Sequence, residues 1–181
     1  KYFQVSGALG IQKTIFLPTG GSPDNRGYEV HEKDLLKKQK KYRKKIIGFC
    51  SVNEADPKNA EKFEKCLRKG GKGLKLLGGH PALYDEPLNS KKMMKVYEVA
   101  KKYHVPVLFH GSIINIPEME NQIRDFVGEF PGITFIHAHY CSSIKKGVNL
   151  ERCAKLLDDF PNLQVDISLG HGINDLIRYL Q

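Results

Sequence analysis

The sequence predicts an α/β protein of the (β/α) TIM-barrel type, and three observations lead to this fold class. Six apolar, strand-like runs begin near residues 14, 46, 73, 105, 133 and 163, and each interval also holds a helix-like segment. Strands that alternate with helices form parallel sheets with right-handed crossovers. The chain has neither a GxGxxG nor a GxxxxGK[ST] motif, which argues against the nucleotide-binding α/β folds. A complete barrel has eight βα units in about 250 residues, so the 181 residues predict about six units, without the first and last strands, in one domain over 1–181.

Strands and helices alternate along the first half of the chain. In order, the sequence predicts a strand at 14–18, a basic helix at 33–45, a strand at 46–52, a helix starting at Asp56 and a strand at 73–77. Asp56 is an N-cap residue type, Pro57 suits the first helical turn, and Gly70 is typical of a helix end. Each predicted strand is a short apolar run bounded by turn-forming residues.

The second half of the chain repeats this alternation. In order, it predicts a helix capped by Ser90, a strand at 105–110, a helix opened by Pro117, a strand at 133–139, a helix capped by Asn149, a strand at 163–169 and a closing helix near 173–180. The helical segments carry apolar residues three or four positions apart, as Met93, Tyr97 and Ala100 do, which is the spacing of a core-facing stripe.

Composition narrows the class of protein. The hydrophobic content of 40% and charged content of 27% are ordinary for a soluble globular domain, and no apolar run reaches the roughly 20 residues that span a bilayer. We therefore expect no membrane partner.

The four cysteines form no CxxC pair, which favours reduced thiols and a cytoplasmic location. Cys141 could be a thiolate ligand, but an inert thiol is the favoured interpretation. The chain begins with Lys1 and not with Met, which hints at residues upstream.

The net charge of +9 raises nucleic acid as a partner, because basic residues concentrate at 33–45. A helix there can place Leu35, Leu36 and Gln39 on one side and its lysines on the other. A solvated outer helix is the favoured interpretation, since no RNP, zinc-finger or helix-turn-helix pattern accompanies it. Nucleic acid is not an expected partner.

Histidines occur near the ends of two neighbouring predicted strands. His110 ends the run 105–110, and His137 and His139 lie in the run 133–139. Side chains alternate along a strand, so His137 and His139 are expected to share a face. Because α/β enzymes place their chemistry at the carboxyl ends of parallel strands, the three imidazoles are expected to converge there. A catalytic zinc site needs about three protein ligands and an open position. His137 is favoured as a packed histidine or one that holds a ligand in place, with a third metal ligand as the alternative.

Three further residues are candidates for substrate binding or for support of the site. Lys75 alternates with leucines on a predicted central strand, and a buried lysine must be paired, deprotonated or modified. A salt bridge to Asp166 would satisfy it. Asp166 itself shares a predicted strand face with Gln164 and Ser168. His80 follows two glycines in a loop and could touch substrate or belong to a turn.

Four segments follow one another in order: 73–76 (GLKL), 105–111 (VPVLFHG), 130–139 (FPGITFIHAH) and 162–168 (NLQVDIS). Together they resemble successive barrel strands of the amidohydrolase superfamily, in the branch that mixes hydrolases, lactonases and decarboxylases. The resemblance implies a TIM barrel with one or two divalent metals at the strand ends. It implies that His110 is a metal ligand and that His139 either binds metal or polarises water or substrate. Lys75 lies where some branches carry a carboxylated lysine.

The sequence departs from the family pattern at three places. Nothing before Thr14 matches the His-x-His pair of the family's first strand, and the aspartate of the eighth strand has no counterpart. Leu77 stands where a Lys-Leu-His-Pro pattern would have histidine, with His80 three residues later. The departures leave two interpretations: the chain is a fragment, or the fold has lost its metal chemistry.

The leading prediction is a metal-dependent hydrolase or decarboxylase that acts on a small, anionic substrate. Zinc is the expected ion, with manganese or iron as alternatives, and His139 would assist proton transfer. The alternative is a catalytically incomplete barrel that serves as a binding or assembly module. Because an incomplete barrel exposes sheet edges that proteins rarely leave uncovered, a homo-oligomer is a further expectation.

Overall fold

The computed structural model describes residues 2–18, 26–79, 86–113, 115–139, 148–166 and 168. Its strands are β1 (Thr14–Phe16), β2 (Ile46–Gly48), β3 (Cys50–Ser51), β4 (Leu74–Gly79), β5 (Val107–Gly111), β6 (Phe135–His137) and β7 (Leu163–Val165). β1 pairs with β2, and β3 to β7 form a five-stranded sheet in chain order. Every pair is parallel. The predicted run 46–52 is present but is interrupted at Phe49, so six strand positions appear as seven short strands.

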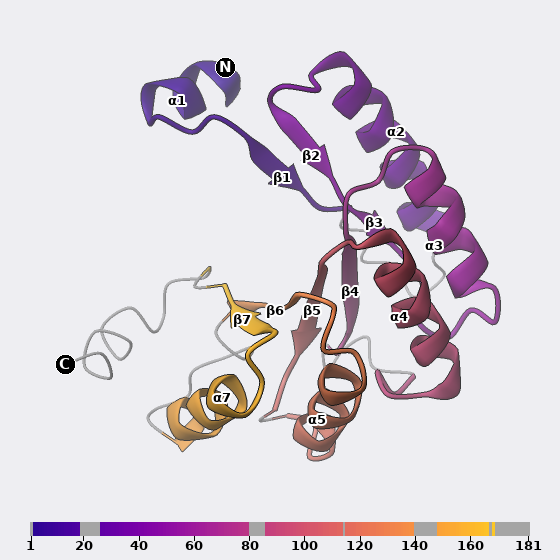
Figure 1. Ribbon diagram of the computed structural model, residues 1–181. Coiled ribbons are helices and arrows are strands. Elements are labelled where there is room, and N and C mark those ends of the chain that lie inside the picture. The colour runs from indigo at the N-terminus through magenta and orange to yellow at the C-terminus, as the bar shows by residue number, and fades with distance from the viewer. Residues whose placement is uncertain are drawn as a thin grey trace.

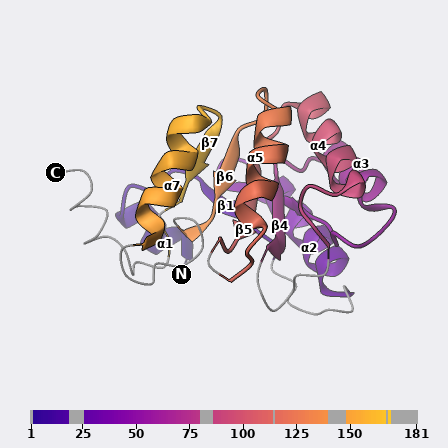
Figure 2. The ribbon, with the colours of Figure 1, turned by 90° about the horizontal axis from the view of Figure 1, so that it is seen from below.

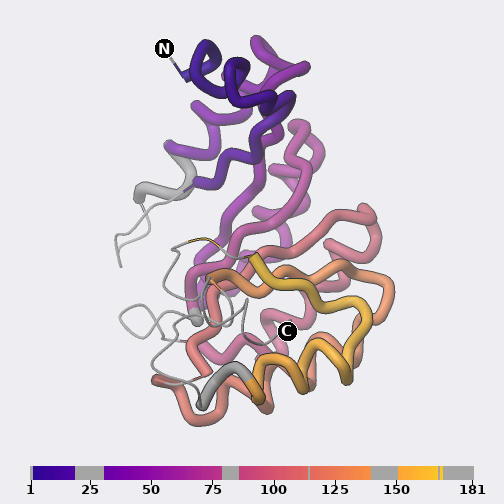
Figure 3. The backbone as a smooth tube through the Cα atoms, turned by 90° about the vertical axis from the view of Figure 1, so that its left-hand side faces the viewer, coloured from indigo at the N-terminus to yellow at the C-terminus, as the bar shows by residue number. Residues whose placement is uncertain are grey.

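The described helices are α1 (Tyr2–Ala8), α2 (Arg26–Lys41), α3 (Asn59–Arg68), α4 (Lys91–Tyr103), α5 (Met119–Glu129) and α7 (Val148–Asp159). Figures 1 and 2 show α2 to α7 in a row along one side of a curved array of strands. In Figure 3, α1 with β1 lies at one end of this array and β7 with α7 at the other. Among the described residues β1 and β7 do not pair, so the barrel-type array is open.

The two faces of the five-stranded sheet differ in composition. In the register of the sheet, Leu76, Phe109 and His137 stand side by side, and so do Lys75, Leu108 and Ile136. The first row faces the helices, where Phe109 packs edge-on against Phe126 of α5. The second row faces the inside of the curved array. Side chains on this inner face at the carboxyl ends of the strands are therefore positioned for function.

The predicted helix start at Ser90 was confirmed, whereas other helices begin at residues different from those predicted. The Ser90 side chain accepts a hydrogen bond from the Met93 N–H at 3.3 Å and caps α4. Asp56 instead accepts the Lys58 N–H in a turn, so α3 begins at Asn59. Asn149 lies inside α7, and α1 was not predicted. The closing helix predicted near 173–180 lies outside the described residues.

The basic helix packs as its pattern predicts. Leu35 and Leu36 of α2 are buried, whereas Lys37, Lys38 and Lys40 are exposed. The helix ends at Lys41, so the last lysines of the run 33–45 follow it. None of the described helices is long enough and apolar enough to cross a membrane.

The expectation of reduced thiols is wrong for the three cysteines that the structure describes, since Cys50, Cys66 and Cys153 are all disulfide-bonded. Cys50 of β3 and Cys66 of α3 form a disulfide with an S–S distance of 2.04 Å. Both residues are almost fully buried. Gly71 lies beside the bond, and a Cβ there would come within 2.2 Å of the Cys50 Sγ. The sequence separation of 16 residues hides this pairing, because the two positions meet only when α3 packs on the sheet. Cys141 lies outside the described residues.

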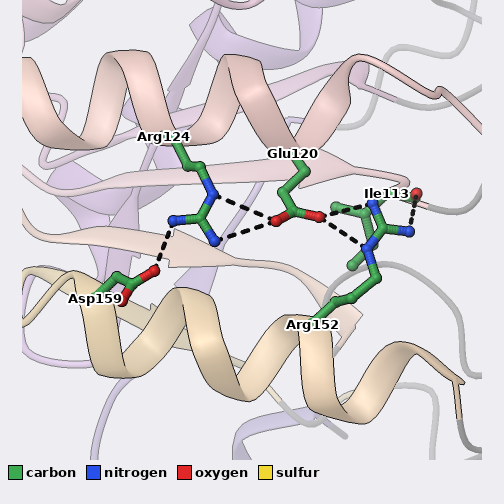
Figure 4. A network of polar contacts seen from close by, with 5 residues as sticks. All are labelled: Ile113, Glu120, Arg124, Arg152 and Asp159. Atoms are coloured by element: carbon green, nitrogen blue, oxygen red, sulfur yellow. Dashed lines mark hydrogen bonds and ion pairs between the residues drawn. The ribbon is translucent and has the colours of Figure 1, made fainter.

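A network of charged side chains joins α5 to α7 (Figure 4). Glu120 pairs with Arg124 of its own helix at 3.1 Å and with Arg152 of α7 at 2.7 Å. Arg124 also reaches Asp159 at 2.6 Å. Arg152 donates a 3.3 Å hydrogen bond to the Ile113 carbonyl, so the network also holds the loop that follows His110.

Candidate active site

His110 and His139 meet at the carboxyl ends of β5 and β6. His110 lies on the inner face of β5, and His139 follows β6 after one residue. Their ring centroids are 5.4 Å apart, with an interplanar angle of 62°, and both side chains are partly exposed. The two imidazoles therefore converge as the strand pattern predicts, because β5 and β6 are parallel neighbours.

His137 lies on the opposite face, which corrects the prediction that three imidazoles converge. It stacks on Phe109 with ring centroids 4.5 Å apart and is fully buried. The strand β6 ends at His137, and His139 has a left-handed backbone with φ of 56°. Side-chain alternation thus stops before His139, and the two histidines separate onto different faces.

The His137 ring ties β6 to the end of β5. Its Nε2 lies 2.6 Å from the Gly111 carbonyl oxygen, whereas its buried Nδ1 has no hydrogen-bond partner in the described part of the chain. Burial lowers the pKa of His137 to about 4, although the hydrogen bond to Gly111 acts in the opposite direction. A neutral ring that donates from Nε2 satisfies this geometry, so His137 supports the strand that carries His110.

Asp166 holds the turn that presents His139. Its Oδ1 accepts hydrogen bonds from the His139 N–H at 3.2 Å and the Ser168 N–H at 2.9 Å, and from the Ser168 hydroxyl. Burial acts to raise the pKa of Asp166, but the hydrogen bonds from Ser168 and His139 outweigh it and lower the pKa overall. Asp166 is therefore an ionised carboxylate beside the histidine pair.

The hydrogen bonds of Ser168 determine the tautomer of His139. The Ser168 Oγ lies 2.8 Å from the His139 Nδ1. Its single hydrogen is donated to Asp166, because a carboxylate can only accept. The His139 Nδ1–H must then be the donor to Ser168, which leaves the lone pair on Nε2. In metal-binding and general-base histidines, an oxygen that accepts the proton of one ring nitrogen likewise leaves the other nitrogen deprotonated, so that it can bind a metal or accept a proton.

Lys75 is buried on the inner face of β4, where 4% of it is exposed. Burial lowers its pKa to about 8, while the charges of Asp166 and Glu54 act to raise it. No ion pair joins Lys75 to Asp166 among the described residues, so the predicted salt bridge is replaced by attraction over a longer distance. At pH 7 the side chain remains mainly an ammonium group.

Glu54 was missed by the sequence analysis. Its side chain is 4% exposed, and its Oε1 accepts the backbone N–H groups of Leu77 and Gly78 at 2.9 and 2.7 Å. The available signal was its position, since Glu54 follows the predicted strand 46–52 at the edge where His110 also lies. His80 lies outside the described residues.

His110 and His139 provide part of the ligand set that a divalent metal requires. Imidazole is a ligand for zinc, manganese and iron, and a catalytic zinc site takes about three protein ligands. In the described part of the chain, one group brings three ligand atoms within 4.8 Å of one another: Glu32, Cys50 and Cys66. Its two sulfurs are joined as a disulfide. The histidine edge thus offers two fitting imidazoles, with the Asp166 carboxylate behind them.

Residues 18–175 match the family Amidohydrolase. The chain belongs to the amidohydrolase family. A 4-oxalomesaconate hydratase from Rhodopseudomonas palustris superposes with a TM-score of 0.73 and 17% identity, over 99% of this chain and 62% of that chain. An uncharacterized TIM-barrel protein from Bordetella bronchiseptica gives 0.72 and 19%, over 98% and 63%. A dihydroxybenzoic acid decarboxylase from Polaromonas, solved with bound manganese and an inhibitor, gives 0.60 and 15%, over 77% and 54%.

These similarities establish the fold class that the sequence predicts. The amidohydrolase chain has the TIM-barrel type of architecture, with six strand positions in parallel. It spans about 63% of the length of the Bordetella barrel. A comparison with curated proteins finds no match.

Proposed function

We propose that this amidohydrolase chain carries part of the active site of a metal-dependent hydrolase or decarboxylase for small, anionic molecules. The observation that carries the proposal is the contact between His110 and His139 at the carboxyl ends of adjacent parallel strands. Family membership supports the enzyme class. The position of the pair supports a catalytic role, because barrel enzymes assemble their sites at this end of the strands.

The proposed metal ligands are His110 and His139. Zinc is the proposed ion, with manganese or iron as alternatives, and the manganese in the Polaromonas decarboxylase supports a divalent ion in general. When bound, such an ion polarises a substrate oxygen or lowers the pKa of bound water to about 7. The Asp166–Ser168 pair would hold His139 with Nε2 directed to its task.

Proton transfer is the alternative role that we propose for His139, because the same Nε2 lone pair would either bind the metal or accept the proton. The ionised Asp166 oxygen lies 3.9 Å from the His139 Nδ1. A nearby carboxylate stabilises an imidazolium, so His139 can accept a proton at Nε2 and return it. The metal content of a His139 variant distinguishes metal binding from proton transfer.

The position of Lys75 supports the proposal that the substrate is an anion. Its ammonium group lies on the inner face with the apolar side chains Leu108 and Ile136 in register beside it. A buried cation beside apolar walls attracts a carboxylate more strongly than a solvated lysine does. A small acid is therefore the proposed substrate class.

Activity screening tests the proposal. The chain, loaded in turn with zinc, manganese or iron, would be assayed against small carboxylic acids for release of carbon dioxide and against lactones and amides for proton release. We expect turnover that His110→Ala abolishes and that His31→Ala, at an exposed position on α2, retains. Absence of turnover in every metal-loaded sample would contradict the proposal and favour a binding or assembly module.

A further inference from the structure

Within the described residues, the carboxyl-terminal part of β4 has no strand neighbour on its β3 side. β3 is two residues long and pairs with β4 only at Leu74 and Lys75. At and beyond the end of this pairing, side chains provide hydrogen bonds to β4. The hydroxyl of Ser51, the last residue of β3, donates to the Lys75 carbonyl at 2.9 Å, and the Glu54 carboxylate accepts the N–H groups of Leu77 and Gly78.

These two N–H groups lie at an irregularity in β4. Leu76 pairs with Phe109 and Gly79 pairs with Gly111, so three steps on β4 match two on β5. Such a bulge leaves backbone groups without ladder partners, and buried N–H groups need an acceptor. Glu54 supplies one oxygen to both Leu77 and Gly78. The carboxylate therefore holds the bulge in place of a strand.

The fit around Glu54 is close on both sides. A Cβ on Gly78 would lie 2.8 Å from the Glu54 Cδ, a distance that excludes any larger residue without a shift. The Asn59 amide donates to the Glu54 carbonyl at 3.2 Å, which anchors the main chain of Glu54 to α3. Glu54 is thus anchored by α3 and in turn holds the bulge of β4.

Glu54 also acts electrostatically on Lys75, two residues before Leu77. Among the described residues, Asp166, beyond β7, and Glu54 are the negative charges that raise the pKa of this ammonium group against the effect of burial. The group in turn acts on the buried ring of His137. The ammonium group of Lys75 makes no hydrogen bond or ion pair with another described residue, so burial and the charges at longer range set its protonation.

We propose that Glu54 is a positioning residue of the candidate site, which fixes the bulge of β4 and supplies the negative charge that keeps Lys75 an ammonium group. The inference builds on the proposed function, because it gives Lys75 the charge that an anionic substrate would meet. Its test measures Lys75 and β4 themselves, so the result does not depend on turnover or on metal.

The decisive variant is Glu54→Gln, which keeps an acceptor oxygen and removes the charge. Lys75 would be acetylated with trace acetic anhydride across pH 6–10, and the labelled peptide would be quantified by mass spectrometry. Without the carboxylate, we expect the pH midpoint for labelling of Lys75 to fall by about 0.5 unit or more, a roughly threefold fall in the ratio of ammonium to amine at a given pH. Glu61→Gln, at an exposed position on α3, should retain the wild-type midpoint. An unchanged midpoint in Glu54→Gln would overturn the proposal.

A second measurement addresses the bulge. Glu54→Ala removes both accepted hydrogen bonds, and amide hydrogen exchange at Leu77 and Gly78 should become at least about tenfold faster, while Phe109 in β5 keeps its rate. Wild-type exchange at both amides would exclude the structural half of the proposal. If the alanine variant does not fold, the same amides are compared in Glu54→Gln, where slow exchange is expected and rapid exchange would count against the role of the acceptor oxygen.

Discussion

The two faces of the five-stranded sheet follow different rules. On the helix side, Phe109, Phe135 and Leu76 are fully buried. Phe126 of α5 stacks on Tyr97 of α4 and also packs edge-on against Phe109 and at a tilt against Phe135. On the inner side, Lys75, His110 and Asp166 are polar and are either partly exposed or buried at a cost. Packing thus stabilises one face, while the other carries the polar groups proposed for the chemistry, and we expect these groups to cost stability.

Two histidines illustrate the contrast. His137 and His139 are separated by one residue, yet His137 is a neutral, stacked core residue and His139 is a partly exposed residue oriented by Ser168 and Asp166. The end of β6 separates them. Identical side chains therefore acquire different roles according to the face on which the backbone places them.

The largest effect should come from truncation on the helix side. Phe109→Ala removes a fully buried ring that contacts Phe126 and His137. We expect it to lower the free energy of unfolding by roughly 3–5 kcal/mol. Leu108→Ala, one residue away on the inner face and half-buried, should cost below about 2 kcal/mol. Urea denaturation compares them, and a larger loss for Leu108→Ala would reverse the assignment of the faces.

The disulfide sharpens the comparison, because Cys50 stands in register with the helix-facing Leu74. The bond closes a loop of 16 residues between β3 and α3. Its reduction should lower the free energy of unfolding by about 3 kcal/mol, mainly through the entropy of the unfolded chain. Unfolding would be followed with and without dithiothreitol. The double variant Cys50→Ala/Cys66→Ala, which keeps the disulfide bond of Cys153, should lose less stability to the reductant than the wild type does. An equal loss in both would contradict the Cys50–Cys66 bond.

Removal of the Lys75 charge should raise the free energy of unfolding, in contrast to the two changes above. Burial lowers the pKa of Lys75 from its ordinary 10.5 to about 8, which corresponds to a cost of up to about 3 kcal/mol at pH 7. Lys75→Met should therefore raise the free energy of unfolding at pH 7, whereas Lys72→Met, at an exposed position, should leave it nearly unchanged.

The pH dependence of this gain follows from proton binding. Between pH 8 and 10.5 the unfolded chain binds the Lys75 proton more tightly than the folded chain does, so wild-type stability rises with pH in that window. The advantage of Lys75→Met should shrink over the same range. Denaturation at pH 7 and pH 10 measures the change, and a less stable methionine variant at pH 7 would show that Lys75 is a net stabiliser.

Local signals in the sequence were sufficient for the fold. The βα spacing located six strand positions, and Ser90 marked the start of α4, because caps and apolar stripes are properties of neighbouring residues. The same reasoning placed His110 and His139 together. These predictions depend on short-range patterns and on the parallel order of strands.

What the sequence did not reveal depends on tertiary geometry. The alternation rule put His137 on the wrong face because it assumed that β6 continues to His139. The Cys50–Cys66 bond and the Glu54 contact with β4 join segments that meet only after α3 and β4 pack. Neither had a motif that could have signalled it.

The most direct test of the central claim is the metal content of the purified chain, measured by mass spectrometry for the wild type and for three histidine variants. We predict close to one zinc, manganese or iron per chain in the wild type, lost in His110→Ala and His139→Ala and retained in His137→Gln, which keeps a donor for the Gly111 carbonyl. Retention of the metal in His110→Ala, or its loss in a folded His137→Gln alone, would contradict a site on the inner face of the sheet.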